Sequence, residues 1–217
     1  MLVRKLVTEF IGTFFLVLTI GLAVLGQVQT AALAIGAVLM VMVYMGGHVS
    51  GAHYNPAVTL AVWLRGKLPT AEVVPYIATQ LVAAFVAALL AHFILGGTFS
   101  PAPAGNVSLA AFFGLEVLFT FALALVVLNV ATAPTTAGNS YYGLAIGFTV
   151  LAGAFVAGPV SGGAFNPAVG FGPILVDTLF GDGSLRHLWV YLIAPTLGGV
   201  LAAFVYKLQN PEVPPAA

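Results

Sequence analysis

The segment Ser50-Gly-Ala-His-Tyr-Asn-Pro-Ala-Val58 returns later in the chain as Ser161-Gly-Gly-Ala-Phe-Asn-Pro-Ala-Val169, with six of nine positions identical. Each copy places Asn-Pro-Ala inside a long apolar stretch. A turn there would leave backbone N–H and C=O groups without partners, unless it were capped or lined a water-filled cavity. Two such turns in one chain therefore predict a pore.

The composition indicates a protein of the lipid bilayer. Of 217 residues, 61% are hydrophobic and 6% are charged, whereas about 25% are charged in an average soluble domain. A helix needs about 20 apolar residues to cross a bilayer, and six stretches have roughly this length. They are Val3–Leu25, Thr30–Gly47, Ala71–Leu95, Leu109–Ala131, Tyr141–Gly158 and Leu188–Leu208. We therefore predict an all-α, multi-pass integral membrane protein with six transmembrane helices.

The basic residues favour one orientation of these six spans. Arg186 falls on one side of the bilayer, and the others fall on the opposite side: Arg4, Lys5, Arg65, Lys67 and Lys207. By the positive-inside rule, both termini are expected in the cytoplasm. The first span lacks a cleavage pattern, and together with the short tails this suggests a microbial cytoplasmic membrane. The net charge of zero argues against a nucleic-acid partner, and the absence of cysteine excludes thiol chemistry.

The duplication extends from the two turns to whole halves of the chain. Glu9–Phe14 matches Glu116–Phe121, and Leu33–Gly36 matches Leu144–Gly147. Each half has three spans, an odd number, so the second half enters the membrane from the opposite face and the repeat is inverted. We predict a single channel domain over residues 1–217, with repeat 1 at about 1–97, repeat 2 at about 107–209 and a flexible tail at 210–217.

Each Asn-Pro pair has the features of a helix start. Asparagine caps a helix with its side-chain oxygen, and proline suits the first helical position because its missing N–H costs nothing there. Short helices are expected from Pro56 to about Leu64 and from Pro167 to about Val176, each about half a bilayer long. These re-entrant half-helices would bring two positive helix ends to the midplane, with both asparagine amide groups free to donate into the passage.

On these features the chain resembles the aquaporin, or major intrinsic protein, family, of a bacterial or archaeal type. The resemblance covers nearly the whole chain and is carried by Glu9, Glu116, Gly47–Leu60 and Ser161–Ala168. It implies a homotetramer with one pore in each subunit. The implied pore motifs are Asn55, Pro56, Ala57, Asn166, Pro167 and Ala168, and the implied pore-lining carbonyls belong to Gly51, Ala52, His53, Gly162, Gly163 and Ala164. Glu9 and Glu116 would be structural acids that accept hydrogen bonds from the backbone of the turns.

One residue departs from the pattern of the family. Members typically carry arginine directly after the second Asn-Pro-Ala, where it belongs to a narrow filter, and this chain has Val169. Spacing from the turns assigns the other filter positions to Ile35, Ala154 and Gly163. Such an aliphatic filter favours a wide passage for water and small neutral solutes such as glycerol, urea, ammonia or undissociated metalloid acids. The alternative is a strict water channel in which neighbouring helices close in.

Other functional classes fit the sequence less well. An ion-coupled secondary transporter can also be built from inverted repeats, but it needs an acidic coupling site in its pathway, and the intramembrane acids already have a structural interpretation. A purely structural junction protein would leave two capped turns at the midplane without a purpose. No nucleophile-base-acid set, phosphate loop or metal-ligand spacing is present, so we expect no enzyme activity, no cofactor and no bound metal.

Overall fold

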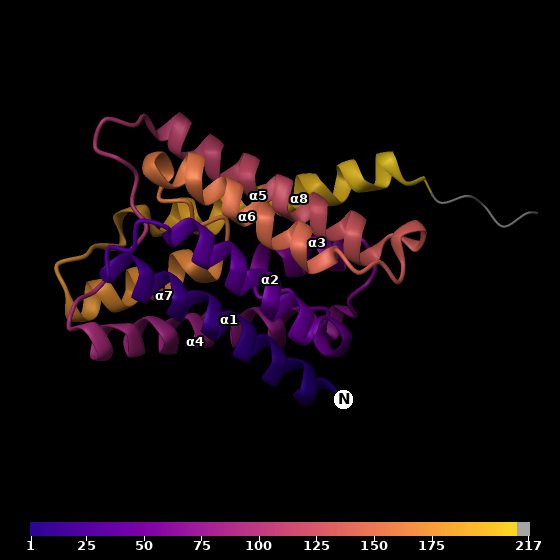
Figure 1. The fold of residues 1–217 in the computed structure, drawn as a ribbon. Helices are drawn as coiled ribbons and strands as arrows, with labels where there is room; N and C mark the ends of the chain where they lie inside the picture. The colour runs from indigo at the N-terminus through magenta and orange to yellow at the C-terminus, as the bar shows by residue number, and fades with distance from the viewer. Residues whose placement is uncertain (212–217) are drawn as a thin grey trace, which may run out of the picture.

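The computed structural model describes residues 1–211, and over this range it consists of helices and connecting loops without β-strands (Figure 1). Six helices are long and apolar enough to cross a bilayer: α1 (Leu2–Leu25), α2 (Ala31–Ser50), α4 (Thr70–Leu95), α5 (Leu109–Thr132), α6 (Tyr142–Ser161) and α8 (Leu188–Gln209). Two short helices follow the repeated motif, α3 (Pro56–Leu64) and α7 (Pro167–Phe180). Single 3-10 turns, η1 (Pro134–Thr136) and η2 (Leu185–His187), lie in connections. The predicted all-α fold with six spans and two half-helices is confirmed.

Both halves have the same order of elements, two long helices, one short helix and one long helix. The helix α1 begins, and α8 ends, at one end of the bundle, on the right in Figure 1. We call this the terminal end and the opposite one the distal end. The half-helix α3 runs from the midplane toward the terminal end, and α7 runs toward the distal end, as an inverted repeat requires. Most of the predicted tail at 210–217 lies outside the described residues.

Three helix ends differ from the predicted limits by about three residues or more, and several others differ by about one. The helices α2 and α6 continue to Ser50 and Ser161, beyond the predicted Gly47 and Gly158. They end where Gly51 and Gly162 adopt left-handed φ angles of 90° and 86°, a conformation that glycine takes without strain. The helix α7 continues past Asp177 to Phe180, although the sequence indicated an end at about Val176. The Asp177 carboxylate accepts two hydrogen bonds from a distant loop and does not interrupt the helix.

The two halves meet where α2 crosses α6 at a pair of glycines. A Cβ atom at Gly36 would lie 2.8 Å from the carbonyl oxygen of Gly147, and one at Gly147 would lie 2.5 Å from the carbonyl oxygen of Gly36. Only the absence of both side chains permits this approach. Close packing of small residues is a main source of helix association in lipid, where burial of apolar surface supplies little.

Candidate functional site

The two repeated turns form the centre of the bundle, and each begins a half-helix with a capping asparagine. The side-chain oxygen of Asn55 accepts a hydrogen bond from the N–H of Ala57 at 2.8 Å, and that of Asn166 accepts from Ala168 at 2.9 Å. Asn55 also accepts a longer hydrogen bond from the N–H of Val58 at 3.4 Å, so the caps satisfy N–H groups that a helix start leaves without a partner. The following prolines occupy the first helical position.

The two asparagines also join the turns to each other. Asn55 Nδ2 donates to the carbonyl oxygen of Phe165, and Asn166 Nδ2 donates to that of Tyr54, both at 2.9 Å. The expectation that both amide groups are wholly free was therefore wrong, because one N–H of each holds the opposite turn. An amide nitrogen has two N–H groups, so one on each asparagine remains for another acceptor.

The backbone before each asparagine has an unusual conformation that repeats in both halves. Tyr54 and Phe165 both have φ of 50°, and Ala52 has φ of 52°. Left-handed angles are costly for residues with a Cβ atom, so other contacts must hold these turns. In this conformation the carbonyl oxygens of Tyr54 and Phe165 accept the hydrogen bonds from the asparagine of the opposite turn.

Glu9 of α1 holds the first turn through four hydrogen bonds. It accepts from the N–H groups of His53 at 2.9 Å and Tyr54 at 2.7 Å, from Ser50 Oγ at 2.7 Å and from Gln80 Nε2 at 2.8 Å. The Glu9 side chain is fully buried. Its contacts are those of a brace for the strained backbone.

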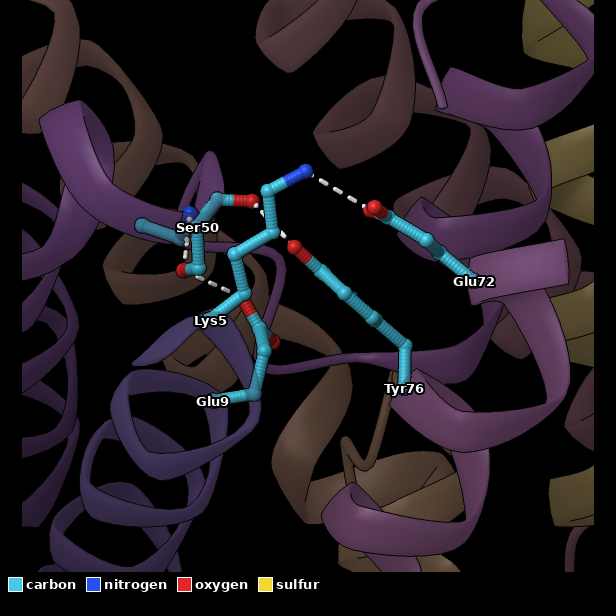
Figure 2. A network of polar contacts seen from close by, with 6 residues as sticks. Lys5, Glu9, Ser50, Glu72 and Tyr76 are labelled. Carbon is cyan, nitrogen blue, oxygen red and sulfur yellow. Dashed lines mark hydrogen bonds and ion pairs between the residues drawn. The ribbon is translucent and has the colours of Figure 1, made fainter. Parts of the chain in front are cut away.

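Figure 2 shows how this brace reaches the neighbouring helices. The Tyr76 hydroxyl of α4 donates to the carbonyl oxygen of Ser50 at 2.8 Å, and Ser50 Oγ in turn donates to Glu9. At the start of the same two helices, Lys5 of α1 and Glu72 of α4 form an ion pair of 2.7 Å. The first turn is thereby fixed to both α1 and α4.

Glu116 of α5 has the equivalent position in the second half with one donor fewer. It accepts from Ser161 Oγ at 2.7 Å and from the N–H groups of Ala164 at 3.2 Å and Phe165 at 2.8 Å. Tyr191 matches Tyr76 and donates to the carbonyl oxygen of Ser161 at 2.6 Å. In the same register, Pro195 stands where the first half has Gln80, which explains the missing amide donor.

A cavity of about 380 Å³ extends from the two asparagines toward the distal end. The four residues assigned to the filter all line it: Ile35, Ala154, Gly163 and Val169. Ala52, His53, Gly162 and Ala164 also line it, as do both asparagines. Sequence reasoning missed the remaining walls, which include Leu123 and Val127 of α5, Ile146 and Val150 of α6, and the loop residues Phe99–Ala102. An apolar side chain in a span gives no sequence signal that separates a cavity wall from helix packing.

A second cavity, of about 360 Å³, opens on the terminal side. Gly51 lines this cavity, together with Lys5, Lys67, Ser50 and Thr132, and His53 and Val127 are shared with the distal cavity. The two cavities therefore lie on either side of a wall at His53 and Val127. His53 Nδ1 lies 3.2 Å from the Thr59 hydroxyl, which holds the ring at this level.

Four residues of the two Asn-Pro-Ala tripeptides line neither cavity. Pro56, Ala57, Pro167 and Ala168 are buried behind the asparagines, where they form the first turns of α3 and α7. Their position is structural: a Cβ atom on Gly199 of α8 would lie 2.5 Å from the carbonyl oxygen of Ala57. Small residues here let the half-helices pack closely on the long ones.

Aspartate, glutamate, lysine and arginine side chains are absent from the region between the two cavities, within the described residues. Within the described chain, neither Glu9 nor Glu116 lines either cavity, and the cationic side chains that do, Lys5 and Lys67, belong to the terminal cavity. The distal cavity is therefore lined by the two asparagines and mostly by aliphatic side chains, with no Asp, Glu, Lys or Arg among its described lining residues. Such a lining can hydrogen-bond uncharged molecules but has no counter-charge with which to replace the hydration of an ion.

Two cavities on either side of a wall at His53 and Val127, beside two opposed half-helices and inside six membrane-spanning helices, define a membrane channel with an inverted repeat. The family model described as "MIP: Major intrinsic protein" matches residues 1–206. The chain thus belongs to the major intrinsic protein family. As a member of this family it is a channel in membranes for water and small uncharged solutes.

Individual relatives agree with this assignment. Aquaporin NIP1-1 of Zea mays is 37% identical over 216 residues, which are 95% of this chain and 74% of that protein. Probable aquaporin NIP5-1 of Arabidopsis thaliana is 39% identical over 222 residues, 94% of this chain and 68% of that protein. The X-ray structure of the aquaglyceroporin from Plasmodium falciparum has the same fold, with a TM-score of 0.88 at 24% identity over 97% of this chain and 98% of that one.

Proposed function

We propose that the protein is a passive, bidirectional channel with a wide aliphatic filter at Ile35, Ala154, Gly163 and Val169. Water and small uncharged solutes such as glycerol, urea, ammonia or neutral metalloid acids pass this filter. The single observation that carries the proposal is the lining of the distal cavity, where Val169 supplies an apolar side chain directly after the second Asn-Pro-Ala.

The distal cavity as a whole, which extends from the asparagines to Val24 and Ala31, has room for solutes larger than water. A single file of water over half a bilayer, about 15 Å, holds about five molecules and takes about 150 Å³ at roughly 30 Å³ each. The cavity of about 380 Å³ is more than twice as large. Aliphatic walls suit the carbon skeleton of a polyol, and the carbonyls of Gly162 and Gly163 and the free N–H groups of the asparagines suit its hydroxyl groups.

The opposed half-helices support exclusion of protons and cations. Each helix start is equivalent to about half a positive charge, and a cation about 5 Å from the pair would be repelled by roughly 3 kcal/mol at an effective dielectric constant of 20. An ion would in addition lose hydration without gaining a counter-charge. The oriented donors at Asn55 and Asn166 also favour one orientation of a passing water, which interrupts proton transfer along a file.

Further features belong to the same proposal. The protein is a homotetramer with one passage in each subunit and a single channel domain, and it has no enzyme activity. The terminal end, where Arg4, Lys5, Arg65, Lys67 and Lys207 gather, faces the cytoplasm, and the protein resides in the cytoplasmic membrane of a microbe. An ion-coupled carrier is disfavoured because the acids Glu9 and Glu116 are engaged by the turns.

The proposal is tested by osmotic swelling of liposomes that contain the purified protein, with gradients of glycerol, urea or an impermeant solute. The wild type is expected to pass glycerol and urea well above the rate of bare lipid. Val169→Arg is expected to lose glycerol flux and keep water flux, and Val169→Leu controls for size without charge. Solute flux equal to that of bare lipid beside rapid water flux would mean a strict water channel, and flux driven by an ion gradient would mean a carrier.

A further inference from the structure

The loop between α4 and α5, residues 96–108, forms part of the wall of the distal cavity. Four consecutive residues of this loop, Phe99–Ala102, line the same cavity as the proposed filter. Ser100 contributes the one polar side chain of that cavity outside the two repeated turns, within the described part of the chain. The loop therefore lines the same cavity as the filter, and the other residues outside the two turns that line this cavity are glycine or have aliphatic side chains.

The position of the loop is set by Asp177, near the distal end of α7. Thr98 Oγ1 donates to Asp177 Oδ1 at 2.7 Å, and Ser100 Oγ donates to Asp177 Oδ2 at 2.6 Å. Each carboxylate oxygen thus holds one hydroxyl, at the short distances typical of charge-assisted hydrogen bonds. These two bonds flank Phe99 on both sides, so the carboxylate holds the chain on either side of a residue that faces the cavity.

Further contacts enclose the loop on its other sides. The Phe99 ring is buried against α1 at Gly21, where a Cβ atom would lie 2.5 Å from it. The N–H of Ala104 donates to the carbonyl oxygen of Val160 at 3.0 Å. A Cβ atom at Gly162 would lie 2.7 Å from the backbone nitrogen of Ala102. The segment is thus enclosed by α1, the second turn and α7.

Asp177 and Val169 lie on the same half-helix, α7. The loop, through Asp177, and the filter, through Val169, are therefore both attached to α7. Eight residues separate Asp177 from Val169, or about 12 Å along the helix axis. A movement of α7 would carry Val169 and the loop together, whereas loss of the carboxylate would release the loop alone.

We propose that Phe99–Ala102 is a further wall of the selective constriction, and that Asp177 is the positioning residue that fixes its distance from Val169. The inference rests on the proposed function. Since the Ser100 hydroxyl gives its proton to Asp177, its oxygen keeps lone pairs that can accept hydrogen bonds. The wall therefore suits uncharged solutes that carry hydroxyl or amine donors, and its position limits the size of solute that passes.

The first experiment measures the ratio of erythritol or glycerol permeability to water permeability in liposomes. Asp177→Ala, and separately the double variant Thr98→Val with Ser100→Ala, are expected to raise this ratio several-fold, because either change releases the loop. Asp177→Asn retains one acceptor oxygen and is expected to fall between these variants and the wild type. Asp182→Ala, an exposed acid in the next loop, is the matched control and is expected to leave the ratio unchanged.

A merely structural role for Asp177 would lower all permeabilities in the same proportion, without a change of ratio, and that result would overturn the proposal. If the wild type itself passes no solute or water above bare lipid, the proposed function fails and this inference fails with it. Wild-type flux beside unchanged ratios in the loop variants would reject the inference alone.

A second experiment does not depend on how the Asp177 variants fold. The chain has no cysteine, so a single introduced thiol can be modified selectively. A bulky water-soluble thiol reagent is expected to block solute flux several-fold in Ala102→Cys, and to leave it unchanged in Ala110→Cys, an exposed position that does not line the cavity. Full flux after complete modification of Ala102→Cys would place the loop outside the constriction and contradict the proposal.

Discussion

Asn55 and Asn166 hold each other's turn: each donates one N–H of its side-chain amide to the carbonyl of the residue directly before the other, at 2.9 Å in both directions. Each side-chain oxygen meanwhile caps its own half-helix. Each asparagine side chain thus caps its own half-helix, contacts the opposite turn and lines the distal cavity. The reciprocity explains why the motif must occur twice.

Replacement of Asn55 by aspartate keeps the cap and removes the amide donor. The new carboxylate oxygen would face the carbonyl of Phe165, so Asn55→Asp is expected to lower the free energy of unfolding by about 1–3 kcal/mol, the cost of an unmade buried hydrogen bond. Asn166→Asp should behave alike, and thermal unfolding in detergent measures both. Asn129→Asp, which loses a hydrogen bond to Leu125 in a half-buried position, is the control and should cost less. Equal losses of unfolding free energy in all three variants would contradict a stabilising role for the hydrogen bonds between the two turns.

The two buried acids should differ in their importance. Glu9→Gln and Glu116→Gln each replace an acceptor oxygen by an NH2 group that faces other donors. Glu9 has four hydrogen-bond donors and Glu116 has three, so Glu9→Gln is expected to lose more stability, by about 1 kcal/mol. Midpoints of thermal aggregation for the two variants test this order. A larger loss of stability in Glu116→Gln would show that the number of hydrogen-bond donors does not determine the effect of the substitution.

The crossing of α2 and α6 depends on its two glycines. Gly147→Leu is expected to abolish the folded protein, because even a Cβ atom would lie 2.5 Å from the carbonyl oxygen of Gly36. Gly114→Ala on α5, where a Cβ atom has no neighbour within 4 Å, should instead be neutral or stabilise by up to about 1 kcal/mol. Yield of monodisperse protein after gel filtration distinguishes the two. A folded Gly147→Leu variant would contradict the close crossing.

The ion pair of Lys5 with Glu72 should matter little for stability. Both side chains keep contact with solvent, at 30% and 17% exposure, and pairs of this kind contribute about 1 kcal/mol or less. Lys5→Met is therefore expected to change the unfolding midpoint slightly, and the difference from the wild type should shrink as salt is added. A large loss that persists in high salt would assign Lys5 another role in the terminal cavity.

The repeated motif made much of the fold predictable. Six apolar stretches predicted six spans, and Asn-Pro at positions 55–56 and 166–167 marked both half-helix starts, because capping is a local property of the chain. The position of the loop Phe99–Ala102 beside the cavity could not be predicted from the sequence. It lacks periodicity, and its anchor is an acid 77 to 79 residues further on.

Asp177 shows the limit of local reasoning most plainly. An acid after an apolar run indicates a helix end when its neighbours in space are unknown. In the folded chain two hydroxyls satisfy its carboxylate, and the helix continues to Phe180. The hydrogen bond between Asn55 and Phe165 likewise joins two turns that lie 110 residues apart in the chain.

In the proposed channel, opposed half-helices hold a hydrated, uncharged passage open at the midplane. The most direct measurement is an experimental density map of the protein in lipid, at a resolution that shows water. We predict ordered water or solute oxygen within hydrogen-bonding distance of Nδ2 of both Asn55 and Asn166, continuous with density along the carbonyls of Gly162 and Gly163. Side chains that fill this space, or asparagines separated too far to share one water, would contradict the account.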